Sequence, residues 1–282
     1  MKVLVTGASG QLGNDICREL NRRGIAYKGV SSAEMELTDA AAVERVLDEF
    51  RPDAVIHCAA YTKVDFAEDE PEICWSVNAG GTWNLVRLCK VREIKVLYIS
   101  TDYVFPGDDD RFYETEDAFH PGSVYGASKL AGELIVKSLL KKYFIVRISW
   151  VFGINGQNFV KTMLKLSESR TECSVVCDQI GSPTYTTDLA PLLCDMILTE
   201  QYGIYHATND GVCSWAEFAE EIFRLAGKQV KVNHVITKDY PVKARRPLNS
   251  RLSKRKLEES GFQSLPDWRD ALKRYLECMQ LG

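Results

Sequence analysis

The stretch KVLVTGASGQLGNDICREL, residues 2–20, decides the fold class. A short apolar run leads into three glycines, and a stretch with helical spacing follows them. Gly7 lets a strand turn sharply, Gly10 lets backbone N–H groups approach a pyrophosphate, and Gly13 lets the helix pack close to the strand. The start of that helix would present unpaired backbone donors to an anion. We therefore predict that this loop binds the phosphates of a dinucleotide.

Further apolar runs alternate with helical stretches along the first half of the chain. Residues 40–50 show the helical pattern, with apolar side chains on one face and charged ones on the other. Such alternation implies right-handed crossovers and a parallel sheet covered on both faces. We predict an α/β fold with a doubly wound, Rossmann-type sheet over residues 1–153. The predicted strands after the first are 26–30, 54–58, 95–100 and 144–151.

The pattern loosens after about residue 150, and residues 154–282 are predicted to form a smaller substrate-binding part. Residues 203–209 resemble one more strand, which could return to the main sheet. Ser214 and Glu217 have the spacing of a capping box before a helix. Residues 267–279 are predicted to form a closing amphipathic helix.

Composition excludes several classes of protein. A formal charge of −4 over 282 residues argues against a general nucleic-acid binder. No window offers 18 uninterrupted apolar residues for a membrane span, and the first residues leave no room for a signal peptide. The nine cysteines are scattered, and the close pair Cys173 and Cys177 lacks further zinc ligands. A cytoplasmic protein with reduced thiols is expected.

The second predicted strand leaves the choice between NADH and NADPH open. It ends in GVSSAE, residues 29–34, with no acidic residue at its tip to bind a ribose 2′-hydroxyl. No arginine stands there for a 2′-phosphate. Ser31 and Ser32 suit either cofactor, and Glu34 lies further along.

A tyrosine and a lysine stand four positions apart in SVYGASKLAGE, residues 123–133. Such a pair is expected by chance about once in this chain, so its context has to carry the interpretation. On a helix, Lys129 would lie on the face of Tyr125, and an ammonium nearby favours the phenolate. A ketone that receives a hydride needs such a proton donor. Ser100 and Thr101, directly after the strand 95–100, supply a hydroxyl for the substrate oxygen.

The glycine pattern G-x-x-G-x-x-G, preceded by Thr6, resembles the extended short-chain dehydrogenase/reductase family. Five segments together resemble one group within it, the dTDP-4-dehydrorhamnose reductases, over nearly the whole chain. These segments are TGASGQLG, STDYVFPG, YGASKLAGE, DQIGSPTYTTDLA and KARRPLNSRLS.

The resemblance implies a role for each of a set of residues. It implies Thr101, Tyr125 and Lys129 as the catalytic set. The cofactor residues would be Gly7, Gly10, Gln11, Leu12, Gly13, Ser31, Ala60, Tyr61, Thr62 and Lys129. The substrate residues would be Thr101, Asp102 and Trp150, with Arg245 or Arg246 on the diphosphate and residues 178–186 as a loop of the pocket.

The implied reaction is hydride transfer from NADPH or NADH to the C4 ketone of dTDP-4-dehydro-L-rhamnose, with Tyr125 giving the proton. Related dehydratases carry Thr-Asp-Glu at the strand end, whereas Tyr103 follows Asp102 here, which disfavours elimination. Some relatives use magnesium through acidic residues; Asp15 could correspond to one, but we predict no metal. A nucleotide-sugar epimerase with retained NAD and a non-catalytic regulatory subunit remain as alternatives, and a homodimer stays open.

Overall fold

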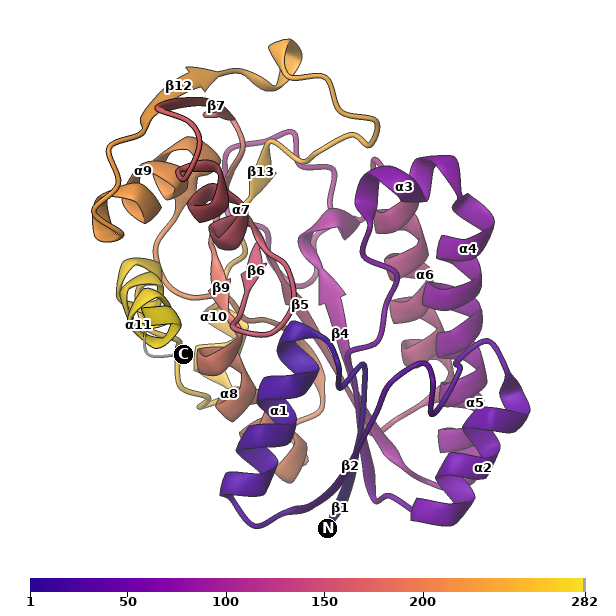
Figure 1. The fold of residues 1–282 in the computed structure, drawn as a ribbon. Helices are drawn as coiled ribbons and strands as arrows, with labels where there is room; N and C mark the ends of the chain where they lie inside the picture. Colours follow the sequence, from indigo (N-terminus) through magenta and orange to yellow (C-terminus); the bar gives the residue numbers. More distant parts are fainter. Residues whose placement is uncertain (281–282) are drawn as a thin grey trace.

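A parallel sheet of six strands forms the centre of the fold (Figure 1). The computed structural model describes residues 1–280. The strand order is β10-β5-β4-β3-β1-β2, so the direction of winding reverses between β1 and β3. At such a switch point the loops diverge and leave a crevice at the carboxyl ends of the strands. This confirms the predicted doubly wound α/β class. The strands are β1 (Lys2–Thr6), β2 (Ala26–Val30), β3 (Ala54–His57), β4 (Lys95–Thr101), β5 (Tyr143–Ile148) and β10 (Gly203–His206).

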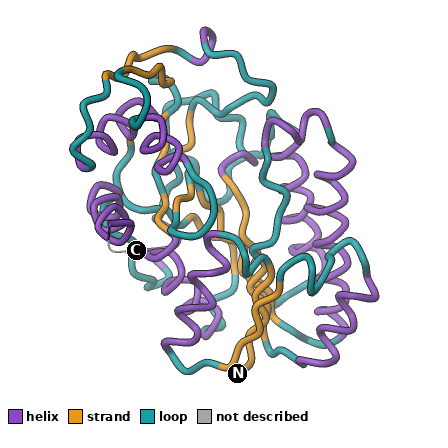
Figure 2. Tube along the Cα trace, viewed as in Figure 1, coloured by secondary structure: helices purple, strands orange, loops and turns teal. Residues whose placement is uncertain are grey.

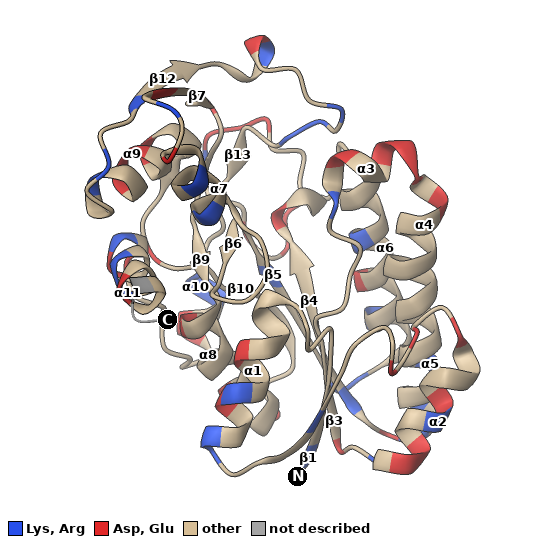
Figure 3. Ribbon diagram, in the orientation of Figure 1, with Lys and Arg blue, Asp and Glu red and all other residues tan. Residues whose placement is uncertain are grey.

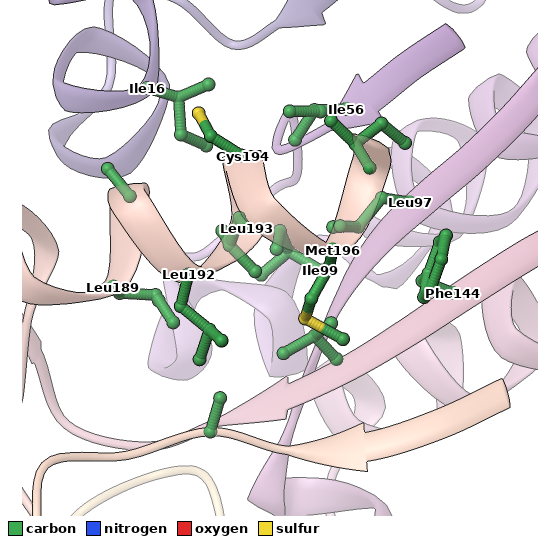
Figure 4. Packing of buried hydrophobic residues seen from close by; sticks show 14 of the residues in the cluster. Ile16, Ile56, Leu97, Ile99, Phe144, Leu189, Leu192, Leu193, Cys194 and Met196 are labelled. Carbon is green, nitrogen blue, oxygen red and sulfur yellow. The ribbon is translucent and has the colours of Figure 1, made fainter. Parts of the chain in front are cut away.

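Alternate side chains of the strands enter two separate cores. Val3 and Val5 of β1 lie in one core, and Leu4 lies in the other. Helices α1 (Gln11–Arg22) and α8 (Thr186–Leu198) cover the first face, and Figure 4 shows α8 directing its apolar side chains at the strands. The opposite face is covered by α2 (Ala40–Phe50), α5 (Thr82–Val91) and α6 (Val124–Leu139). The sheet therefore lies between two helical layers, as the tube view shows (Figure 2).

The strand Gly203–His206 belongs to this main sheet although it follows a long excursion of the chain. β10 pairs in parallel with β5, with Gly203 opposite Phe144 and His206 opposite Arg147. The expected run 144–151 is interrupted, because Trp150 has a left-handed backbone with φ of 49°. The strand therefore ends at Ile148, and a separate short strand, β6 (Val151–Phe152), begins the next part of the chain.

A third core lies to the left of the main sheet in Figure 1. Helices α7 (Phe159–Leu166), α9 (Trp215–Leu225) and α11 (Trp268–Gln280) pack around buried aromatic rings, among them Phe152 and Tyr185. The capping box is present, since the Ser214 side chain accepts from the Glu217 N–H and Glu217 accepts from the Ser214 N–H. The remaining strands are short: β7 (Glu172–Val176), β8 (Ile180–Gly181), β9 (Thr184–Tyr185), β11 (Cys213–Ser214), β12 (Lys231–Val235) and β13 (Asn249–Ser250).

Several short helices complete the described chain. They are α3 (Val64–Asp69), α4 (Pro71–Trp75), the π-helix η1 (Ser76–Gly81), the 3₁₀ turns η2 (Asp102–Val104) and η3 (Thr237–Asp239), and α10 (Arg255–Glu259). Within residues 1–280, no helix combines the length and the apolar character needed to cross a bilayer.

Gly13 shows how tightly α1 packs against the loop before it. A Cβ atom at this position would lie 2.2 Å from the Gly7 carbonyl oxygen, which is backbone and cannot move aside. We expect Gly13→Ala to lower the free energy of unfolding by about 2 kcal/mol, as for other overpacked sites, measured by urea denaturation. Gly80→Ala is the control, because its Cβ would meet nothing closer than 4.0 Å. Equal stability of the two variants would contradict this packing.

Candidate active site

A cavity of about 640 Å³ opens at the carboxyl ends of the central strands. Its volume is typical of a site for a small molecule or cofactor. The structure brings most of the sequence-predicted residues to its wall. These are Gly7, Gly10, Gln11, Leu12, Gly13, Ser31, Ala60, Thr62, Thr101, Asp102, Tyr125, Lys129 and Trp150.

The glycine segment 7–13, called the phosphate loop below, has the features of a site for the phosphates of a dinucleotide. Gly10 is the N-cap of α1, and no side chain caps the helix. The first turn of α1 carries no acidic residue, so its backbone N–H groups face the cavity without a competing carboxylate. The Asn155 side chain donates to the Ser9 carbonyl at 2.7 Å and holds the loop from outside. These features provide an anion site at the helix start.

A buried hydrogen-bond chain runs beneath the cavity from β1 to β3 and then to α5. The Ala59 N–H donates to Thr6 Oγ1 at 3.1 Å, and Thr6 Oγ1 lies 2.7 Å from His57 Nδ1. On the other side of the ring, His57 Nε2 lies 3.2 Å from Thr82 Oγ1, which donates its proton to the Asn78 carbonyl at 2.6 Å. Thr82 therefore accepts from Nε2–H, which leaves Nδ1 as the acceptor for Thr6. Burial, with a smaller effect of Lys129, lowers the pKa of His57 to about 3, so the ring is neutral.

Asn78 extends this chain to α6. It lies in the π-helix η1, a type of irregularity that is frequent at functional sites. Its side-chain oxygen accepts from the Tyr61 N–H at 2.8 Å, and its amide donates to the Tyr61 carbonyl at 3.1 Å and to Ser128 Oγ at 3.0 Å. Ser128 in turn donates to the Tyr125 carbonyl at 2.8 Å. The loop 60–62 and the start of α6 are thus fixed to one buried amide.

The ammonium group of Lys129 is buried and held by the sheet. It donates to the Ile99 carbonyl at 2.8 Å and lies 4.1 Å from the centre of the Tyr98 ring. Burial lowers the pKa of Lys129 to about 7, and the Glu133 carboxylate one turn along opposes that shift. Glu133 is itself paired with the fully buried Arg147 at 2.8 Å, which ties α6 to β5.

Tyr125, Thr101 and Asp102 converge at the end of β4. Burial raises the pKa of Tyr125, and a hydrogen bond with Thr101 lowers it by a smaller amount. Thr101 Oγ1 donates to Asp102 Oδ1 at 3.0 Å, and the Ser250 hydroxyl donates to Oδ2. Burial raises the pKa of Asp102 to about 6 although both hydroxyls favour its charged form. The Thr101 hydroxyl therefore stands between the Tyr125 phenol and the Asp102 carboxyl group and hydrogen-bonds to both.

Among residues 1–280, the Lys129 ammonium makes no hydrogen bond to the Tyr125 hydroxyl. The two residues share a helix, but the ammonium is directed to the Ile99 carbonyl, and burial dominates the pKa of the phenol and raises it. The four-residue spacing places Lys129 on the correct face of α6.

Two arginines line a second cleft of about 570 Å³. Arg246 donates to the Tyr103 hydroxyl at 3.1 Å, and Tyr103 lines the first cavity, so this contact joins the two spaces. Arg246 also pairs with Asp65 of α3, and Lys243 pairs with Asp69. Figure 3 shows this basic segment crossing to the acidic face of α3. The Arg245 side chain is exposed.

Three expected site residues, Tyr61, Arg245 and Arg246, lie outside the wall of the first cavity. The Tyr61 hydroxyl donates to Glu70 at 3.1 Å and the ring does not line the cavity. The Asp15 carboxylate accepts from Thr186 at 2.5 Å and from Thr187 at 3.2 Å, so it joins α1 to α8. The segment 178–186 was expected to form a loop of the substrate pocket. Within it, Asp178 lines the second cleft. In residues 1–280, no three His, Cys, Asp or Glu side chains gather as metal ligands would.

Sequence reasoning placed Glu34 further along than the tip of β2, and it missed Asn78 and Ser250. Glu34 folds back to the tip of β2, where its carboxylate accepts from the Ser31 N–H at 2.8 Å and from the Ser31 hydroxyl at 2.9 Å. The S-x-x-E spacing of residues 31–34, a known turn pattern, could have indicated this. Asn78 and Ser250 had no signal in the sequence, because the partners that tie them to the site lie 17 or more residues away: Tyr61 and Ser128 for Asn78, and Asp102 for Ser250.

The fold and the cavity define a dinucleotide-binding protein of the Rossmann type whose strand-end hydroxyl and Tyr/Lys helix suit carbonyl reduction. The family model described as the RmlD substrate binding domain matches residues 1–281, and the chain belongs to this family. A relative from Bacillus subtilis, the spore coat polysaccharide biosynthesis protein SpsK, is 41% identical over 98% of this chain and 97% of its own.

Two solved structures are close to this one. A dTDP-4-dehydrorhamnose reductase from Clostridium acetobutylicum has a TM-score of 0.97 and 40% identity, over 99% of this chain and all of that chain. A dTDP-4-dehydrorhamnose reductase from Bacillus anthracis, in complex with NADP, has a TM-score of 0.95 and 44% identity, over 98% of both chains. The resemblance stated from the sequence is confirmed.

The burial of Lys129 gives a prediction on stability. Its pKa falls from 10.5 to about 7 on folding, so between these values the unfolded chain binds the proton more tightly and stability rises with pH. We expect Lys129→Met to be more stable than wild type by on the order of 4 kcal/mol at pH 7, and by about 2 kcal/mol at pH 9. Urea denaturation at both values measures this.

Lys137→Met on the exposed side of the same helix is the control, with an expected change within about 0.5 kcal/mol. Loss of stability in Lys129→Met at both pH values would show that the buried ammonium is net stabilising and would contradict the expectation.

Proposed function

We propose that the protein reduces the C4 ketone of dTDP-4-dehydro-L-rhamnose with NADPH or NADH, giving dTDP-L-rhamnose. The observation that carries the proposal is a single cavity lined by the phosphate loop at one end and by Thr101, Tyr125 and Lys129 at the other. The family and the reductase names of its structural neighbours support the same reaction.

Each of the three catalytic residues has a proposed task. A bound nicotinamide supplies the hydride, and Tyr125 donates its phenolic proton to the oxygen that was the ketone. Thr101, held by Asp102, orients that oxygen. We propose that Lys129 binds the cofactor ribose, and that the through-space effect of its charge favours the phenolate that remains on Tyr125. The lack of a direct Lys129 contact with the phenol in this structure makes the ribose its nearer proposed partner.

The two parts of the chain divide the proposed work. We assign dinucleotide binding to residues 1–153 with β10, and substrate binding to residues 154–282. The two parts of the chain do not form separate layers. Helix α8 of the second part packs on the same face of the sheet as α1 of the first part. Trp150 and Asp102 are proposed to contact the sugar.

The second cleft is the proposed place of the substrate diphosphate. One guanidinium group can donate two parallel hydrogen bonds to two oxygens of a phosphate. Arg245 is the freer of the two candidates, because Arg246 is held by Asp65 and Tyr103. An anionic substrate would thus compete with Asp65 for Arg246.

Two broader assignments accompany this function. We propose a cytoplasmic location, supported by nine free cysteines and by a nucleotide-sugar substrate. A homodimer is a further proposal. Exposed Ile73, Trp75 and Trp83 on α4 and α5 offer apolar surface for it, and sedimentation velocity tests it.

The function is tested directly by mixing the protein with reduced cofactor and dTDP-4-dehydro-L-rhamnose. We expect loss of nicotinamide absorbance matched by an equal amount of dTDP-L-rhamnose, identified by mass and NMR. Isolation of the protein with tightly bound NAD, and epimerised sugar without net oxidation, would instead support a nucleotide-sugar epimerase. No turnover together with stable co-purification of a synthetase would support a regulatory subunit.

The position of Glu34 predicts its effect on cofactor preference. Its carboxylate is held by Ser31 at the tip of β2. We propose that it repels a 2′-phosphate there, by about 1 kcal/mol for two charges at contact distance in water. We expect Glu34→Gln to raise the ratio of kcat/KM for NADPH to that for NADH about fivefold. Glu49→Gln on α2, also exposed, is the control that should leave the ratio unchanged. An unchanged ratio in Glu34→Gln would remove this residue from cofactor selection.

A further inference from the structure

Trp215 stacks on Trp150 without reaching the active-site cavity itself. The two indole rings have centroids 3.8 Å apart and planes inclined by 14°. Trp150 lines the cavity, and in the described chain Trp215 is not among the lining residues. Phe159 of α7 packs on Trp215 with a centroid distance of 4.6 Å, which ties the pair to the third core. Trp215 therefore acts on the cavity only through Trp150.

The backbone of Trp150 explains why such support is needed. Its φ of 49° is in the left-handed region, which is unusual for a bulky residue and persists only when the surroundings impose it. The Thr184 N–H donates to the Trp150 carbonyl at 3.1 Å, and the neighbouring Ser149 hydroxyl donates to the Ser182 carbonyl at 2.8 Å. These contacts fix the backbone of this turn, and they leave the indole ring to be fixed by packing.

The short strands β8 and β11 bring the packing partners together. Cys213 pairs with Gly181, and Ser214 pairs with Ile180. Gly181 lies against the Trp150 ring, since a Cβ there would be 2.8 Å from Trp150 Cε2. Ser214 is the N-cap of α9, and its capping box sets the direction in which Trp215 leaves the strand. One strand pair therefore presents both Gly181 and Trp215 to the Trp150 indole.

We propose that Trp215 is a positioning residue that holds the Trp150 indole as a fixed wall for the hexose ring of the substrate. This rests on the proposed function, which makes a sugar nucleotide the ligand of the cavity. Rigid aromatic faces bind the apolar face of such a ring at little cost in side-chain entropy. The stack would act on the sugar alone, because the phosphate loop and the arginine cleft are built from other segments.

The test compares binding of dTDP-L-rhamnose and of dTDP, both in the presence of NADP⁺, by isothermal titration calorimetry. We expect Trp215→Ala to weaken dTDP-L-rhamnose about tenfold, equivalent to about 1.4 kcal/mol, and to change the Kd of dTDP and of NADP⁺ less than twofold. Trp215→Phe keeps an aromatic stack and should bind the sugar nucleotide within about threefold of wild type.

A spectroscopic readout reports the stack independently of binding. Two stacked indoles give an exciton couplet in the circular dichroism spectrum, which should disappear in both Trp215→Ala and Trp150→Ala. Trp83→Ala, the same change at an exposed site on α5, should keep both the couplet and the affinity.

The outcomes separate this assignment from the function on which it rests. Loss of the couplet in Trp215→Ala with unchanged affinity for dTDP-L-rhamnose would overturn the positioning role. Equal weakening of dTDP, NADP⁺ and the sugar nucleotide would also overturn it, since it would indicate a general loss of structure. Wild-type protein that neither binds nor turns over the sugar nucleotide would overturn the proposed function, and this assignment with it.

Discussion

A chain of buried hydrogen bonds fixes the phosphate loop relative to the catalytic helix. It runs from Thr6 through His57 and Thr82 to Asn78, and from there to Ser128 of α6. All five residues are almost fully buried, where a polar group without a partner would be costly. The proposed hydride transfer requires the nicotinamide and the phenol of Tyr125 to be held at a set separation. This chain links Thr6, the residue before the glycine loop, to the helix that carries Tyr125.

The same region contains buried ionisable groups whose charged forms are disfavoured by burial. The Lys129 ammonium is buried against β4, where it contacts the Ile99 carbonyl and the Tyr98 ring. Burial there favours its neutral form. Asp102 is likewise buried, and two hydroxyls hold its oxygens. Groups whose pKa is shifted in this way cluster at functional sites. There the pKa shift serves the reaction, and the rest of the fold supplies the stability.

The sequence predicted the sheet well because its signals are local. Strands buried on both faces read as apolar runs, and β1, β2 and the helix 40–50 have the expected bounds. The break in the run 144–151 could not be predicted, because the residues that contact Trp150 are distant in sequence. Thr184 hydrogen-bonds to its backbone, and Gly181 and Trp215 pack on its ring. For the same reason the site residues on the glycine loop and α6 could be named, whereas Asn78 and Ser250 could not. The contact of Lys129 with Ile99 also depends on how α6 lies on β4, which spacing along one helix does not determine.

The central claim is that Tyr125 gives the proton during reduction of the sugar nucleotide. Single-turnover stopped-flow absorbance with Tyr125→Phe tests it most directly, with cofactor and substrate saturating and their Kd values measured separately. The account predicts hydride transfer slower by about 10²- to 10⁴-fold, with the Kd of NADPH within about twofold of wild type because the phosphate loop is untouched. Hydride transfer in Tyr125→Phe at the wild-type rate would contradict it.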